Sequence, residues 1–216
     1  PLAPVGRRLP GSVVELLAIG ILAGVLATAF ARSATRFDAQ AAFIFTAVVM
    51  FLIQAAAGLW HTWATLTAPD RQSLLWQVAT YQMALRDLQI HGLALLMIVG
   101  VSLRMLPAIF GASAVPARRA WAAYGIVLAG IVLEVVSFPI YRFTDQRQWL
   151  GGLWGGWLLV TVGVMLIALP WRLWRPFPVA DRSAKFVRIA WGWLAVSLVM
   201  LLALPASRVS SGIAFS

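Results

Sequence analysis

Cysteine is absent from the 216-residue sequence, and charged residues are scarce. Without thiols the chain has no disulfide scaffold, no zinc–thiolate site, no iron–sulfur cluster and no cysteine nucleophile. Charged residues make up 11% of the chain, whereas a soluble domain usually has about 25%. Acidic residues are the rarer class, with 7 against 17 basic residues. These shortages leave too little polar surface for a water-soluble globule.

Apolar residues dominate what is present. They account for 62% of the chain, and the mean hydropathy is +0.87. The apolar runs are continuous, whereas the strands of a lipid-facing barrel alternate apolar with polar residues. The composition therefore predicts an all-α integral membrane protein, with the lipid bilayer as its surroundings.

The strong positive charge has a better explanation than nucleic-acid binding. The net charge is +10 and the isoelectric point is near 11.7. The basic residues are nearly all arginines, with Lys185 the only lysine, and most lie between apolar runs rather than along one stripe. Basic residues in the loops are what the topology of a membrane protein requires. We therefore expect no nucleic-acid partner.

Six segments are long and apolar enough to cross the bilayer as helices. A span of about 30 Å of hydrocarbon needs about 20 residues, and short connections with proline and glycine separate the segments. We predict a single transmembrane domain over residues 1–216, built as a bundle of six helices. Residues 73–87 either lie in the membrane interface or extend the third span. The predicted spans are residues 12–31, 41–63, 88–110, 120–141, 151–171 and 187–205.

The distribution of basic residues predicts the orientation. The side of the bilayer that faces the N-terminus, here called side A, carries Arg7, Arg8, Arg71, Arg86, Arg142, Arg147 and Arg208. The opposite side, side B, carries more: Arg32, Arg36, Arg104, Arg118, Arg119, Arg172, Arg175, Arg182, Lys185 and Arg188. Since positive loops stay in the cytoplasm, we expect side B to be cytoplasmic and the N-terminus periplasmic in a bacterial inner membrane. The sequence begins at Pro1, and we expect further residues to precede it.

Glycines recur at a four-residue spacing in two of the predicted spans. This spacing lets helix backbones approach closely, where dispersion is the main attraction available in lipid. We therefore expect helix packing at these positions. The pairs are Gly20 with Gly24 in the first span, and Gly151 with Gly155 and Gly152 with Gly156 in the fifth.

The two histidines of the chain are the leading candidates for a functional site. His61 lies near the end of the second span and His91 near the start of the third, so both fall on side A at a comparable depth. Two imidazoles from facing helices can ligate a b-type haem. We therefore predict that His61 and His91 are the metal ligands of a haem b. A chlorophyll-type pigment, held by one imidazole through its magnesium, is the alternative cofactor.

Three further residues complete the predicted cofactor site. Asp87 lies four residues before His91, on the same helical face, and is expected to accept the other ring N–H. Arg71 and Arg86 lie on the same side and are expected to pair with haem propionates. In the competing interpretation, each histidine only anchors the end of a span at the interface and binds nothing.

Polar residues at membrane depth are costly and are candidates for function. Glu134, in the fourth span, either relays protons towards the histidines or neutralises an arginine of a neighbouring helix. Arg104 is expected to extend its side chain to the surface of side B. Gln54 lies two turns from His61 on the same face and is expected to hydrogen-bond across helices.

The segment Arg86-Asp87-Leu88-Gln89-Ile90-His91-Gly92, continued by LALLMIVGVSLRMLPAIFG, resembles part of the NnrS-like family. Those proteins are polytopic bacterial membrane proteins associated with nitric-oxide stress and reported to carry haem and copper. The shared feature is a histidine that opens a span, followed by Met97-Ile98, Gly100-Val101 and Arg104. The resemblance covers residues 86–111 and implies one site residue, His91, as a metal ligand. Family members are longer and richer in histidine than this chain.

Two classes of function remain open. In the first, the chain is a haem-binding membrane subunit that acts in electron transfer or in a response to a gas or redox signal. In the second, it is a non-catalytic structural subunit, with or without pigment, of a larger respiratory or photosynthetic complex. Both imply other membrane subunits as partners, and neither requires a stand-alone enzyme. A transporter is disfavoured because the two halves of the chain show no internal repeat.

Overall fold

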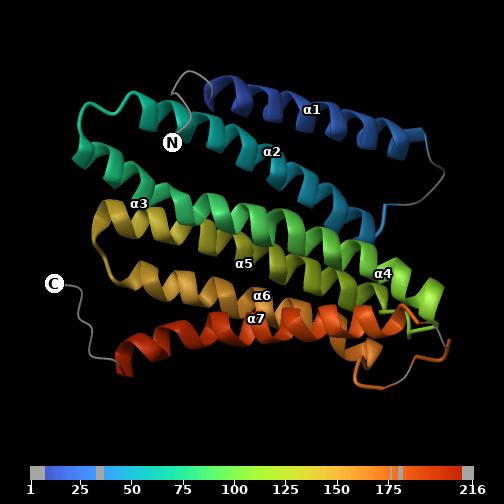
Figure 1. The fold of residues 1–216 in the computed structure, drawn as a ribbon. Helices are drawn as coiled ribbons and strands as arrows, with labels where there is room; N and C mark the ends of the chain where they lie inside the picture. Colours follow the sequence, from blue (N-terminus) through green and yellow to red (C-terminus); the bar gives the residue numbers. More distant parts are fainter. Residues whose placement is uncertain (1–7, 33–36, 176, 180–181, 211–216) are drawn as a thin grey trace.

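The structure is a computed structural model that describes residues 8–32, 37–175, 177–179 and 182–210. Within these ranges it is all-helical, and six helical stretches are long and apolar enough to cross a membrane (Figure 1). The prediction of an all-α, six-helix membrane bundle is confirmed. Arg7 and Arg36, which entered the charge count, lie outside the described residues. The elements are α1 (Arg8–Arg32), α2 (Ala39–Leu66), α3 (Arg71–Asp87), η2 (Leu88–Leu95), α4 (Leu96–Phe110), α5 (Ala117–Thr144), α6 (Gln148–Trp171) and α7 (Ala184–Ser210).

The third span is a continuous helical stretch from Arg71 to Phe110. It consists of α3, the π-helical segment η2 and α4, so residues 73–87 extend the span. Asp70 caps its N-terminus, where its carboxylate accepts a hydrogen bond from the backbone N–H of Ser73 at 2.7 Å. That bond holds the pKa of Asp70 below its usual value. Gly111, in the left-handed conformation at φ 66°, ends α4.

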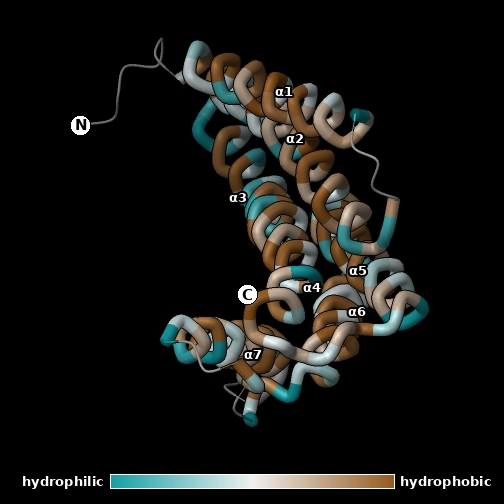
Figure 2. Tube along the Cα trace, turned by 90° about the vertical axis from the view of Figure 1, so that its right-hand side faces the viewer, coloured by the Kyte–Doolittle hydropathy of each residue, from teal (hydrophilic) through white to brown (hydrophobic). Residues whose placement is uncertain are grey.

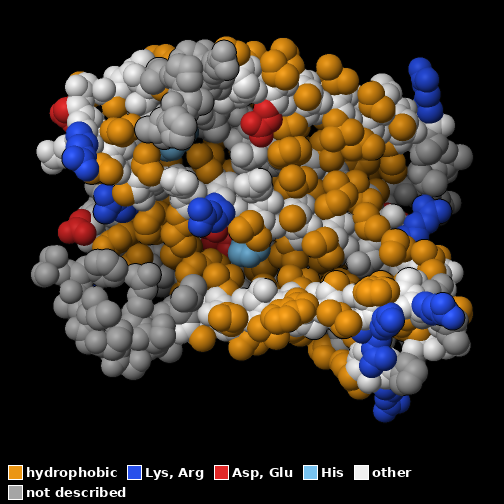
Figure 3. Space-filling view, in the orientation of Figure 1, with side chains coloured by type: hydrophobic (Ala, Val, Ile, Leu, Met, Phe, Trp, Pro, Cys, Tyr) orange, Lys and Arg blue, Asp and Glu red, His pale blue; other side chains and the backbone are white. Residues whose placement is uncertain are grey.

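Consecutive spans run in opposite directions, with α1 against α2 at one edge of the bundle and α7 beside α6 at the other (Figure 1). Hydrophilic residues concentrate towards the helix ends and loops (Figure 2). Most of the visible Lys and Arg side chains lie at the two ends of the molecule, with a broad hydrophobic band between them (Figure 3). This distribution is that of a multi-pass membrane protein, with lipid around the band.

The closest helix packing joins α5 to α6 through glycines. A Cβ atom on Gly156 would lie 2.8 Å from the backbone nitrogen of Glu134, and one on Gly130 would lie 2.8 Å from the carbonyl oxygen of Gly156. Gly152 similarly packs against the side chain of Ser137. The expected packing at Gly152 and Gly156 is therefore present, because only a missing side chain allows this backbone separation.

The other predicted glycine contacts are not all found. A Cβ atom added to Gly20, Gly24 or Gly151 would meet no atom of a neighbouring described helix within 4 Å. No described helix of this chain packs on Gly20 and Gly24, which are exposed on α1, so helix packing at these two glycines stays a prediction. Gly155 makes an ordinary contact with Leu133.

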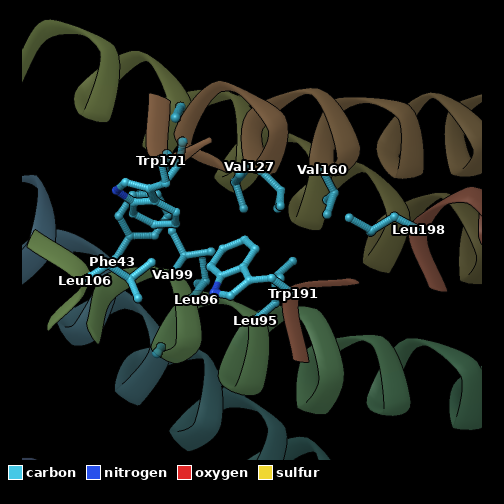
Figure 4. Close-up of a cluster of buried hydrophobic side chains, with 14 of the residues drawn as sticks. Phe43, Leu95, Leu96, Val99, Leu106, Val127, Val160, Trp171, Trp191 and Leu198 are labelled. Atoms are coloured by element: carbon cyan, nitrogen blue, oxygen red, sulfur yellow. The ribbon is translucent and has the colours of Figure 1, made fainter. Parts of the chain in front are cut away.

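A hydrophobic core fills the space between α2, α4, α5, α6 and α7 (Figure 4). Trp191 and Leu198 of α7 belong to it, and the ring of Trp191 meets that of Trp171 edge to face at 5.1 Å. Arg188 anchors the start of α7 by donating from Nε to the carbonyl oxygen of Leu173 at 2.7 Å. Between α6 and α7 an apolar groove of about 530 Å³ remains.

Gly156→Ala tests the α5–α6 contact. The added methyl group meets backbone atoms, so we expect the free energy of unfolding to fall by about 1–3 kcal/mol. The measurement is unfolding of the detergent-purified protein in sodium dodecyl sulfate, followed by tryptophan fluorescence. Gly151→Ala is the matched control on the same helix, since open space surrounds it. Equal effects of the two substitutions would contradict the packing.

Candidate functional site

A hydrogen bond between His91 and Glu134 joins two helices in the bundle interior. Nδ1 of His91, in η2, lies 2.7 Å from Oε1 of Glu134, in α5. The Glu134 side chain is fully buried and that of His91 is 12% exposed. Among the described residues this is the contact that meets the distance criterion for a histidine–carboxylate ion pair. It leaves Nε2 of His91 without a hydrogen bond to any described residue.

Buried polar residues extend from this pair along the α3–α5 interface. Thr80, Asp87, Glu134 and Ser137 are the buried polar residues of the described chain. Asp87 interacts electrostatically with both Glu134 and His91, and its Oδ2 atom has no hydrogen-bond partner among the described atoms. The expectation that Asp87 accepts the ring N–H of His91 is wrong, because Glu134 occupies that position from across the interface.

The π-helical segment η2 places His91. It runs from Leu88 to Leu95, and π-helical turns in proteins occur frequently at functional sites. The neighbouring glycine lets α2 pack directly against the segment: a Cβ on Gly92 would lie 3.0 Å from the Cβ of Met50. His91 is therefore held between α2 and α5 on a locally widened helix.

His61 lies in a different part of the interface between α2 and the third span. Its ring packs against that of Tyr81 at a centroid distance of 6.4 Å. On the same two helices Gly92 faces Met50. Because the helices are antiparallel, moving eleven residues along each from that contact brings residue 61 opposite residue 81, in agreement with the ring contact. Tyr81 precedes His91 by ten residues, which is about 15 Å of helix. This separation is too large for His61 and His91 to share one iron.

The expectation that His61 and His91 lie at a comparable depth in the membrane is therefore wrong. It rested on a third span that begins at residue 88, whereas the helix begins at Arg71. His91 consequently lies near the middle of a 40-residue helical stretch, while His61 lies close to the end of α2 at Leu66. Nε2 of His61 is buried and has no hydrogen-bond partner among the described atoms.

The arginines predicted for haem propionates differ in their distance from His91. Arg86 is exposed and precedes His91 by little more than one helical turn. Arg71, also exposed, precedes His91 by 20 residues, or about 30 Å of helix, so it does not belong to a site at His91. Arg104 is exposed near the other end of the span, where it lines a cavity with Asp38.

Gln54 is buried at its Oε1 atom, which has no hydrogen-bond partner among the described atoms. Thr46 and Thr62 make cross-helix hydrogen bonds from α2 instead: the Thr46 hydroxyl lies 2.7 Å from that of Tyr124 in α5, and the Thr62 hydroxyl lies 3.5 Å from that of Ser12 in α1. The expected role of Gln54 as a cross-helix hydrogen-bonding residue is therefore not observed.

The side chains that could ligate a metal favour a single imidazole ligand over a metal centre enclosed by several protein side chains. Within the described ranges no cluster of three or more His, Cys, Asp or Glu side chains could enclose a metal ion. The residues present therefore do not fit a copper centre that the protein alone ligates. They do fit a single axial imidazole, since Glu134 fixes the His91 ring through Nδ1 and leaves Nε2 free.

Comparison of the chain with family models, with curated proteins and with solved structures found no match. The resemblance of residues 86–111 to the NnrS-like family therefore stays a prediction. The site rests on the geometry of His91 and Glu134.

The hydrogen bond between Glu134 and His91 was not predicted as such, because sequence reasoning gave Glu134 either a proton relay towards the histidines or an arginine partner. A signal was available, because ionisable groups inside a membrane usually pair with one another. Tyr81, the neighbour of His61, carried no such signal, since aromatic residues are common throughout the chain.

Nitrogen-15 NMR of the imidazole rings tests the pair. Glu134→Leu removes the partner of Nδ1, so we expect the ring signals of His91 to shift strongly and those of His61 to stay in place. His61→Gln assigns the two rings, because the chain has only two histidines. If Glu134→Leu shifts the ring signals of neither histidine, the hydrogen bond between His91 and Glu134 is not formed.

Proposed function

We propose that this chain is a multi-pass protein of a bacterial inner membrane that binds a b-type haem through Nε2 of His91. The observation that carries the proposal is the hydrogen bond from the opposite ring nitrogen to Glu134 at 2.7 Å. Histidines that ligate metals almost always use their second nitrogen in this way, which fixes the ring and increases the basicity of the ligating atom.

Charge supports the same assignment. Glu134 is fully buried, and an ionised carboxylate inside a membrane bundle needs a positive partner. The described residue within ion-pair distance of it is His91, which is positive only when protonated. Iron held by Nε2 of His91 would contribute positive charge at the other edge of the same ring. The exposed Arg86, one turn before His91, could pair with a propionate.

The proposed ligation uses one histidine, since His61 lies about ten residues away in register. A haem bound there would supply one-electron redox chemistry and the capacity to bind a gas. The protein fixes the imidazole through Glu134 and surrounds the site with apolar helices. We propose electron transfer or a gas or redox response as the activity, with side A periplasmic and side B cytoplasmic.

A structural subunit is the second candidate function. The observation that favours it lies on α1, where Gly20 and Gly24 face open space on a helix with little burial. A surface of this kind can receive a helix of another membrane protein. In this case the purified protein would be colourless and would co-purify with other subunits of a respiratory or photosynthetic complex. A chlorin in place of haem would be recognised by extraction of the pigment.

Absorption spectroscopy tests the haem proposal. We expect the detergent-purified protein, supplied with hemin, to show a Soret band that His91→Ala abolishes. His61→Ala is the matched control and should keep the band. Glu134→Leu should weaken haem affinity by about 10–100-fold, as expected for loss of a group that orients a metal ligand. Equal binding by the wild-type protein and His91→Ala, or no binding by either, would rule the proposal out.

A further inference from the structure

The groove between α6 and α7 is hollowed out of the membrane-spanning part of the bundle. Little of α7 is buried, and it meets the core through Trp191 and Leu198. Beside these two residues the helices leave an apolar space of about 530 Å³. Most of the side chains that line it are aliphatic, among them Val164, Ala168 and Leu169 of α6 and Ile189, Leu194 and Ala195 of α7.

The length of the groove matches one leaflet of a bilayer. Its lining on α7 runs from Lys185 to Leu198, which is about 20 Å of helix. A bilayer with its headgroups is about 40–45 Å thick, so the groove extends from the surface of side B to about the middle of the membrane. Gly192 helps to keep it open, since a Cβ atom added there would meet no other atom within 4 Å.

Two basic residues line the groove at its side B end. Lys185 and Arg188 are three residues apart, so they share one face of α7. The Nε of Arg188 donates to the carbonyl oxygen of Leu173 at 2.7 Å, which holds the guanidinium beside the groove. A guanidinium has four further N–H donors. The described lining contains no Asp or Glu, so the groove joins an apolar interior to a positively charged mouth.

The surroundings of the mouth have the character of a headgroup region. Trp174 lines the same end of the groove and is 62% exposed, and tryptophan is enriched at the level of lipid headgroups. Basic side chains gather at the end of the molecule where α7 begins (Figure 3). They include the exposed Arg172, Arg175 and Arg182. Basic pockets between membrane helices on the cytoplasmic side bind anionic headgroups, and side B is the side that we expect to be cytoplasmic.

We propose that the groove between α6 and α7 binds one anionic phospholipid. Its phosphate lies at Lys185 and Arg188, where the guanidinium supplies paired N–H donors and the ammonium a point charge. One acyl chain follows the apolar lining towards Leu198. The ammonium of a zwitterionic lipid would find no carboxylate in the described lining. A helix of another protein could cover the apolar part but would have to bring acidic groups to the mouth. The site is separate from His91 and does not depend on haem.

Native mass spectrometry of the detergent-purified protein tests the headgroup preference. The probes are phosphatidylglycerol, which is anionic, and phosphatidylcholine, which is zwitterionic. We expect one phosphatidylglycerol to bind at least about tenfold more tightly, because two basic residues at a headgroup favour an anionic lipid by about that factor. Lys185→Gln combined with Arg188→Gln should remove this preference. Arg118→Gln combined with Arg119→Gln is the matched control, since both arginines are exposed on side B outside the groove.

A second pair of variants tests the apolar part of the site. Gly192→Phe fills the groove without a change of charge, so we expect it to weaken phosphatidylglycerol binding at least about tenfold. Ala190→Phe is its control, because Ala190 is exposed on α7 and does not line the groove. If the double Lys185 and Arg188 variant does not fold, as judged by circular dichroism, Lys185→Gln alone should still reduce the preference.

Three results would overturn the proposal. The first is equal affinity for the two lipids, and the second is an equal loss of binding in the groove variants and their controls. The third is a dimer, visible in the same spectra, that Gly192→Phe dissociates, because a second copy of the chain would then occupy the groove.

Discussion

The contact between His91 and the buried carboxylate of Glu134 is the interaction on which the candidate site depends. Polar groups are costly inside a bundle surrounded by lipid, so each must find a partner across a helix interface. This one joins η2 to α5 and orients the imidazole. Without it, His91 would be one partly exposed ring on a long helix, with nothing to select its tautomer or its direction.

Close packing at glycines holds the helices that carry this contact. Gly156 of α6 approaches so near to the backbone nitrogen of Glu134 that a Cβ atom would not fit. Gly92, next to His91, leaves room for the side chain of Met50 on α2, whose Cβ would lie 3.0 Å from an added Cβ. Both residues of the pair therefore stand on helices that pack closely at glycines. Backbone atoms resist small shifts between α5 and α6, and the Met50 side chain resists those between α2 and η2.

Much of the architecture was predictable from sequence because it follows from apolar run length. The six spans and the packing of Gly152 and Gly156 depend on local composition alone. The start of the third span was misplaced because residues 73–87 are of intermediate polarity, although they continue the helix. That error placed His91 near an interface and at the depth of His61. Which polar residues meet depends on helix register, which a single sequence does not specify.

The His91 imidazole, fixed by Glu134, is the single protein ligand that we propose for this site. Electron paramagnetic resonance of the oxidised, haem-loaded protein tests it most directly. We predict a high-spin ferric signal, as expected for one histidine ligand, that is unchanged in His61→Ala and lost in His91→Ala. A low-spin bis-histidine signal that disappears when His61 is replaced would contradict it.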